Sequence, residues 1–346
     1  MHPDFPRQFA AALLPAWLWL VIATALIGRA DAMGLERLPN ANSGPSFGAG
    51  DFETLPPSVT ADELPPARDP ILPDTSDWPA ESGDFCDGNH PSAGLPWCWQ
   101  WLPSGLVWRS YLAGVKEPRF AWLMSDDSRF DTIWDTTLGG RVALLRYGTP
   151  NAYRPNGWEI QFEAAALPRL WPTKPSWPLV SCDYRVGVPL VYAYGPWQFK
   201  TGYYHISAHL GDEFMLLNPG WPRINYIRDS WMLALGYYYT EDLRLCAEVD
   251  YAFEYDGGAR PWEFQFGADY SPAERGGAPF AAAYANLRQE LDFGGFVVFQ
   301  LGWQVRGGPA MHTFRVGVEY VNGASTQYEF FNLFEQRVGF GIWYDY

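Results

Sequence analysis

Long segments in which apolar and polar residues alternate are the feature that most limits what this chain can fold into. Successive side chains of a β-strand point to opposite faces, so such a segment is an amphipathic strand. In residues 243–255 one face carries Leu243, Leu245, Ala247, Val249, Tyr251, Phe253 and Tyr255, and the other carries Arg244, Cys246, Glu248, Asp250 and Glu254. The pattern recurs over residues 158–166, 262–270, 297–305 and 314–320. Strands of soluble domains have about five or six residues, whereas tilted membrane strands need about nine to eleven. The lengths favour membrane strands.

About twelve such segments lie between residues 119 and 346, which is an even number, as in bacterial barrels. We therefore predict an all-β fold, an antiparallel up-and-down transmembrane β-barrel of about 12 strands. Short links such as 195–196 and 241–242 suit hairpins at one rim. The longer links 148–156, 167–178 and 211–222 are expected at the other rim.

A soluble β-sandwich or a lipocalin-like barrel is the alternative fold. Both also alternate, but their strands are shorter and their charged faces point to water. Here the polar faces carry both signs, as in Glu163, Arg244 and Glu319. Inside a small membrane barrel, opposite charges can pair and fill the lumen, so the membrane barrel is favoured.

The last alternating segment ends the chain on an aromatic residue. Over residues 338–346, one face carries Val338, Phe340, Ile342, Tyr344 and Tyr346. This segment resembles the terminal strand of bacterial outer-membrane barrels, which serves as the recognition signal for insertion. The resemblance implies a location in the bacterial outer membrane. It also implies two partners, outer-membrane lipid and the barrel assembly machinery, which would bind through residues 338–346.

The start of the chain is predicted to direct export. Arg7 precedes an apolar run, and Ala30-Asp31-Ala32 supplies small residues for cleavage, so residues 1–32 are interpreted as a signal peptide. A single membrane-spanning helix is the alternative. Residues 33–95 are acidic and rich in Pro, and they are predicted to be a disordered linker because they carry too few apolar residues to offset the entropy of ordering. Residues 96–346 form the predicted barrel domain.

Composition supports an envelope protein and argues against nucleic acid. Aromatic residues make up 17% of the chain, and Trp and Tyr favour membrane–water interfaces. A net charge of −15 gives no basic surface for nucleic acid. A disulfide between Cys86 and Cys98 would close a short loop in an exported protein. Cys182 and Cys246 fall on faces of different character and are not expected to pair.

Three motifs are similar to those of a known family. They are Tyr111-Leu112-Ala113 followed by Lys116-Glu117-Pro118-Arg119-Phe120, then Leu138-Gly139-Gly140-Arg141, and residues 205–213. Together they resemble an uncharacterised family of bacterial envelope proteins that carries a domain of unknown function. The resemblance covers about residues 98–346 and implies an outer-membrane barrel. It implies no activity.

Residues 205–213 hold the candidate chemistry. On a strand, His205, Ser207 and His209 share one face, and a His beside a Ser can take its proton if an acid or amide orients the imidazole. Outer-membrane phospholipase A and the lipid A deacylase also place His and Ser on one strand. His205 as base and Ser207 as nucleophile would need Glu213, Asn218 or a carboxylate of a neighbouring strand as the orienting group.

Face parity weakens this hypothesis. Tyr204, Ile206, Ala208 and Leu210 form the apolar face, which in a membrane barrel is expected to contact lipid, so the histidines and Ser207 are expected in the lumen. In the barrel phospholipase, the His-Ser pair faces lipid. His209, Asp212, Arg244 and Glu248 are accordingly predicted to be ligand-binding or lumen residues.

No cofactor or metal site is predicted. His205 and His209 lie about 13 Å apart along a strand, too far for one zinc ion. There is no phosphate loop or dinucleotide motif. The leading functional hypothesis is a non-enzymatic barrel, structural or a narrow channel, with a charge-filled lumen. The alternative is a barrel-embedded hydrolase of lipid or lipid A that uses the His-x-Ser pair.

Overall fold

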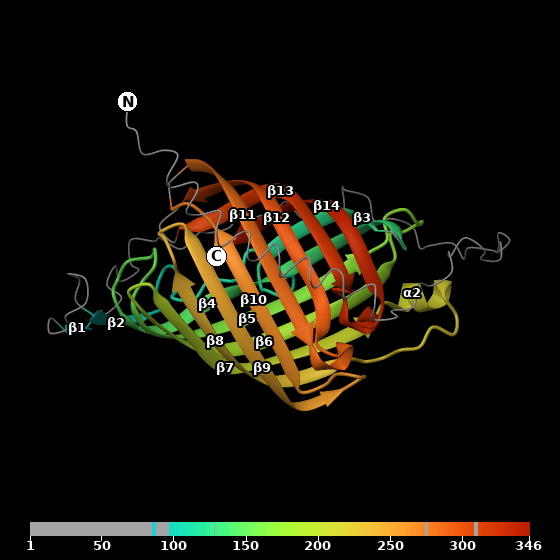
Figure 1. Cartoon of the computed structure of the whole chain (residues 1–346), viewed down its shortest axis with the longest axis horizontal. Coiled ribbons are helices and arrows are strands. Elements are labelled where there is room, and N and C mark those ends of the chain that lie inside the picture. Colours follow the sequence, from blue (N-terminus) through green and yellow to red (C-terminus); the bar gives the residue numbers. More distant parts are fainter. Residues whose placement is uncertain (1–84, 88–96, 128, 274–275, 308–310) are drawn as a thin grey trace, which may run out of the picture. The chain divides into compact units, whose positions relative to one another are not determined.

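The fold was examined in a computed structural model that describes residues 85–87, 97–127, 129–273, 276–307 and 311–346. Twelve strands, β3 to β14, form a closed antiparallel barrel, because β14 pairs back onto β3 (Figure 1). This confirms the predicted all-β barrel of twelve strands. The predicted signal peptide and nearly all of the predicted linker lie outside the described residues. Within the described ranges, no helix has the length and apolar character needed to cross a membrane.

The elements follow one another in simple order. The barrel strands are β3 (Phe120–Asp127), β4 (Asp131–Gly148), β5 (Gly157–Leu170), β6 (Leu179–Tyr194), β7 (Trp197–Leu210), β8 (Ile227–Tyr238), β9 (Leu243–Asp256), β10 (Trp262–Tyr270), β11 (Gly276–Arg288), β12 (Gly294–Gly307), β13 (His312–Ala324) and β14 (Phe334–Asp345). The elements that are not strands of the ring are β1 (Phe85–Asp87), β2 (Trp97–Trp101), the helix α2 (Asp212–Leu217), and the 3-10 turns η3 (Gln289–Leu291) and η4 (Tyr328–Phe330).

The alternation of residues along the strands separates a charged interior from an apolar outer surface. On β5, Glu159 and Glu163 are buried inside, whereas Trp158, Ile160 and Phe162 are exposed outside. Large exposed apolar side chains are unfavourable in water and are what a barrel surrounded by lipid presents. The polar faces predicted from the sequence therefore line the interior over most of the barrel.

Successive links alternate between the two ends of the barrel. The end that carries Tyr346 (the C-terminal end) holds the turns at 195–196 and 239–242 and also the longer link 149–156. The other end (the α2 end) holds 171–178, the α2-containing link 211–226 and 325–333. The prediction that 148–156 lies at the rim opposite the short turns is wrong. Strand direction, and not link length, decides the end at which a link lies.

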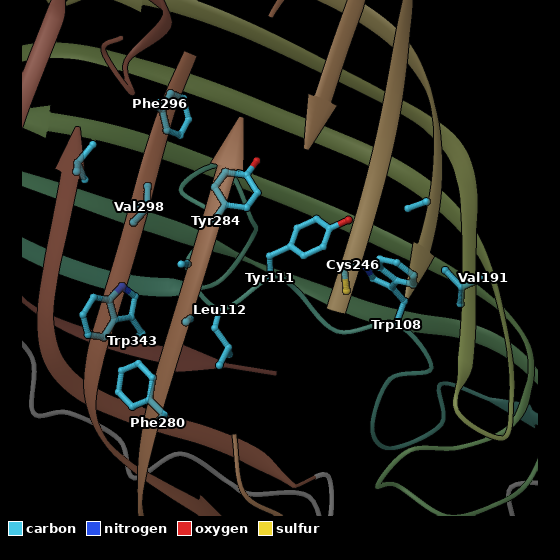
Figure 2. Packing of buried hydrophobic residues seen from close by; sticks show 14 of the residues in the cluster. Trp108, Tyr111, Leu112, Val191, Cys246, Phe280, Tyr284, Phe296, Val298 and Trp343 are labelled. Carbon is cyan, nitrogen blue, oxygen red and sulfur yellow. The ribbon is translucent and has the colours of Figure 1, made fainter. Parts of the chain in front are cut away.

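A segment of the chain lies inside the barrel. Both β2 and β3 pair with the same edge of β4. The strand β2 pairs with residues 145–148, and β3 pairs with residues 131–138. Between these two strands lie residues 102–119, which we call the plug. The Leu102 amide still donates to the Leu144 carbonyl of β4, and from Gly105 on the plug lies in the lumen. Trp108 and Tyr111 of the plug have no exposed surface. Figure 2 shows both, with Leu112, among side chains from the surrounding strands.

Hydrogen bonds from opposite sides of the wall hold the plug. The Val107 amide donates to Glu159 (3.0 Å), and the Leu112 amide donates to Asp269 (3.1 Å). The Tyr111 hydroxyl donates to Glu248 (2.5 Å). Arg244 donates to two plug carbonyls, those of residues 109 and 110, each at 2.9 Å. The charged side chains that line the interior thus bind the plug.

Wall glycines provide the space that the plug aromatics occupy. A Cβ added at Gly267 would lie 2.9 Å from Cδ1 of Tyr111, and one added at Gly236 would lie 3.3 Å from a ring carbon of Trp108. Real Cβ atoms do not approach a ring carbon to 2.9 Å. The ring of Tyr111 therefore requires a residue without a side chain at position 267.

Candidate functional site at the outer face of β7

The structure places His205 and Ser207 on the outside of the barrel. Along β7, Gln198 and Lys200 are buried in the interior, and the same parity sends Tyr204 and Ile206 inward. His205 and Ser207 therefore face outward and are partly exposed. The prediction that they face the lumen is wrong, and so is the same prediction for His209, which is exposed on the same outer face.

The physical reason is that β7 faces aromatic and apolar side chains inside the barrel near the α2 end, beside the buried charges there. There Tyr204, Ile206 and Ala208 pack against Tyr226 and Tyr328, in an apolar cluster that excludes water. Tyr328 belongs to the β13–β14 link, which lies within this cluster. An apolar strand face can be buried either by lipid or by such a cluster, and periodicity alone does not tell the two apart.

Asp229 on β8 lies directly opposite His205 on β7. Nδ1 of His205 is 3.0 Å from Oδ1 of Asp229, and the Tyr203 hydroxyl donates to the same carboxylate. The side chains of His205 and Asp229 are 28% and 18% exposed, so the pair is partly desolvated. A carboxylate accepts hydrogen bonds and does not donate them, so Nδ1 carries the proton and the lone pair of neutral His205 is on Nε2.

The pair lies just beyond a row of outward-facing aromatic residues. Tyr203, Trp231, Tyr251 and Trp262 are direct cross-strand neighbours on four successive strands. Such a girdle marks the level of the membrane–water interface in outer-membrane barrels. Two residues nearer to the α2 end, His205 faces Asp229, and Asp229 in turn faces Glu254 of β9. The polar row therefore lies on the α2 side of this girdle.

A groove adjoins the pair on the same outer face. It has a volume of about 460 Å³, and its lining includes Ala164, Ala166, Tyr184, Val186 and His205. Arg185 also belongs to the lining, but its side chain faces inward and binds Glu163. The outward side chains are apolar apart from His205 and the Tyr184 hydroxyl. The groove crosses β5 and β6 and ends at His205 on β7.

The remaining predicted site residues lie elsewhere. Glu213 and Asp212 are exposed in the first turn of α2, so Asp212 does not line the lumen as predicted. Arg244 and Glu248 face the interior and bind the plug. In the described ranges, no three His, Cys, Asp or Glu side chains are grouped so as to hold a metal ion. Cys182 and Cys246 are free, as expected, whereas Cys98 is disulfide-bonded and lies opposite Cys86 in the β1–β2 pair.

The sequence did not identify Asp229 individually. A carboxylate on a neighbouring strand was one of the expected partners for His205, but β7 and β8 are joined by the long link 211–226. The register across such a link cannot be counted from a turn type. The usable signal is the Asp229-Ser230-Trp231 segment, where an acidic residue stands two positions from an outward aromatic residue, as His205 does from Tyr203.

Comparison with known proteins identifies one protein family and several solved barrel structures that are similar to this chain. Residues 100–346 match the family described as "Protein of unknown function (DUF1207)". Outer membrane phospholipase A from Escherichia coli matches at 12% identity, over 66% of this chain and 94% of that chain, with a TM-score of 0.46. A KdgM porin in complex with disordered oligogalacturonate matches at 11% identity, over 66% and 98%, with a TM-score of 0.37. No curated protein matches. The barrel resembles outer-membrane proteins, and no site is carried over from them.

Proposed function

This chain belongs to the DUF1207 family of proteins of unknown function, and we propose that it is an outer-membrane hydrolase of ester-linked lipids. Ser207 is the nucleophile, His205 the general base and Asp229 the group that orients His205. The site works on the outer face of the barrel, in the leaflet at the α2 end.

The observation that carries this proposal is the His205–Asp229 hydrogen bond on the same outward face as Ser207. A buried or half-buried acid that binds one ring nitrogen fixes the tautomer in which the other nitrogen is a base. Ser207 stands two residues along the strand, about 7 Å away between Cα atoms. The proposal requires the Ser207 hydroxyl to reach Nε2 when substrate binds, as catalytic contacts often tighten only in the complex.

The chemical steps follow from these roles. Oγ of Ser207 attacks the ester carbonyl carbon while its proton passes to Nε2 of His205. The bond from carbonyl carbon to alkoxy oxygen breaks, and the leaving alcohol takes the proton from His205. Water then attacks the acyl-serine with His205 again as base, which releases the fatty acid and restores Ser207. Asp229 stabilises the imidazolium in both steps.

The sequence suggested a barrel that is either structural or a narrow channel. The filled interior favours a barrel without an open channel. The plug occupies the lumen and binds the wall charges that would otherwise line a pore. A lipid reaches the outer face without passing through the lumen, so a filled barrel is compatible with the proposed activity.

The test is fatty-acid release from a phospholipid in mixed micelles by the folded, heat-modifiable barrel. Ser207→Ala and His205→Ala are expected to lower the rate by about 10³-fold or more, and Asp229→Asn by about 10²- to 10⁴-fold. The matched control is Thr201→Ala, which removes an exposed outward hydroxyl from the same strand. A fluorophosphonate is expected to label Ser207 in the wild type. Release that persists in folded Ser207→Ala, or no release by the wild type, would refute the proposal.

A further inference from the structure

The groove beside His205 exists because two outward positions of β5 carry alanine. Elsewhere on the outer face of that strand the residues are larger, such as Trp158, Ile160 and Phe162. At Ala164 and Ala166 the surface falls back toward the backbone, while exposed Leu138 and Tyr184 stand on either side. The result is a local hollow in an otherwise convex wall.

Strand register connects this hollow to the proposed nucleophile. Ala166 pairs with Tyr184 on β6, and Tyr184 pairs in turn with Ser207 on β7. Two residues away along each strand, Ala164 pairs with Val186, which pairs with His205. Two parallel rows of outward side chains thus run from the alanines to the His-Ser pair, across neighbouring strands that lie about 5 Å apart.

The groove has the size and chemistry of a ligand site. Its volume of about 460 Å³ falls within the range of about 300–1,000 Å³ that is usual for small-molecule sites. Within a bilayer, apolar surface is covered by lipid everywhere, so a preference must come from packing and not from the hydrophobic effect. A hollow lets one chain contact wall atoms on several sides, and such dispersion contacts are small singly but large together.

We propose that this groove binds one acyl chain of the ester lipid and that it selects long chains by packing them across Ala164 and Ala166. This inference rests on the proposed hydrolase function, which makes the bound lipid a substrate. A chain laid along the rows leads its carbonyl end to the polar row at His205 and Ser207, which lies on the α2 side of the aromatic girdle.

The experiment separates the groove from the catalysis. Ala166→Leu fills the hollow, and Ala247→Leu makes the same change at an outward position of β9 that does not line the groove. In active protein, hydrolysis of esters with short and long acyl chains is compared. In the Ser207→Ala background, a phospholipid with a photoreactive diazirine in its acyl chain is cross-linked and the adducts are mapped by mass spectrometry.

Adducts are expected to concentrate at Leu138 and Val186, and to fall about tenfold with Ala166→Leu but not with Ala247→Leu. Long-chain hydrolysis is expected to fall similarly in Ala166→Leu, with short-chain hydrolysis retained. Adducts spread evenly around the outer face, or unchanged by Ala166→Leu, would overturn the groove assignment. Concentrated adducts without any hydrolysis by the wild type would retain the lipid site and refute the hydrolase alone.

Discussion

One of the buried ion pairs that bind the plug to the wall lies near the point where the plug returns to it. Lys116 of the plug binds Asp183 of β6, and their side chains are 8% and 0% exposed. Asp183 also accepts the Tyr328 backbone N–H at 3.0 Å, and Nζ of Lys116 lies 4.6 Å from the centroid of the Tyr328 ring. Lys116→Met removes the cation and leaves the Asp183 carboxylate buried with one amide donor.

Removing one partner of a buried ion pair costs about 3–5 kcal/mol, because the remaining charge is desolvated without compensation. A factor of ten in an equilibrium constant corresponds to 1.36 kcal/mol. The ratio of docked to undocked plug is therefore expected to fall about 10²- to 10⁴-fold. Burial lowers the pKa of the Lys116 ammonium, and the Asp183 carboxylate opposes this shift. The double variant Lys116→Met, Asp183→Asn removes both charges and is expected to recover most of the loss.

Hydrogen exchange of plug amides measures this opening. The Val107 and Leu112 amides donate to wall carboxylates, so their exchange reports undocking. Exchange at both is expected to rise about 10²- to 10⁴-fold in Lys116→Met and to return toward wild type in the double variant. An amide inside β12, such as that of Val298, serves as the control for global unfolding. A rise of less than about threefold in Lys116→Met, or exchange in the double variant at least as fast as in Lys116→Met, would refute the reasoning.

Three further predictions concern the plug and the outer surface. Replacing residues 103–118 with a flexible linker of about six residues, and residues 325–333 with Gly and Ser, removes both segments that fill the lumen. This variant is expected to produce discrete conductance in a planar bilayer, where the wild type shows none. Equal conductance of the two proteins would contradict a filled lumen. Gly267→Leu is expected to displace the Tyr111 ring and accelerate exchange of plug amides while the barrel stays heat-modifiable, and unchanged exchange would mean that the ring does not need this space. Leu301→Arg, at an outward position that is 60% exposed, is expected to cost about 2–4 kcal/mol of folding free energy in liposomes. The control Leu216→Arg, in the α2 link, is expected to cost little, and equal costs would argue against a lipid-facing wall.

Much of the fold could be predicted because the alternation of apolar and polar residues along a strand is a local property of the sequence. The segments around Glu159, Glu248 and Glu263 keep their charged sides together whatever their neighbours are, and in the structure these sides face inward. That the plug enters the lumen was not predicted, since the lumen exists only after twelve strands have closed.

The candidate site shows the same division. That His205 and Ser207 share a face was evident from the sequence, but which face it is was predicted wrongly. Asp229 was not identified because its register with His205 follows a long link, and the groove was not foreseen because it needs alanines of β5 beside side chains of β4, β6 and β7.

By itself, the sequence determined twelve amphipathic strands, their approximate lengths and the sets of residues that share a face, because strand period is a property of the covalent chain. The tertiary structure decided which face is buried at each depth, since an apolar face is satisfied equally by lipid or by a packed interior. At the α2 end the cluster around Tyr328 supplies that interior, so β7 turns its apolar side inward and presents His205 and Ser207 outward. Ring closure and strand register then placed Asp229 and the groove beside them.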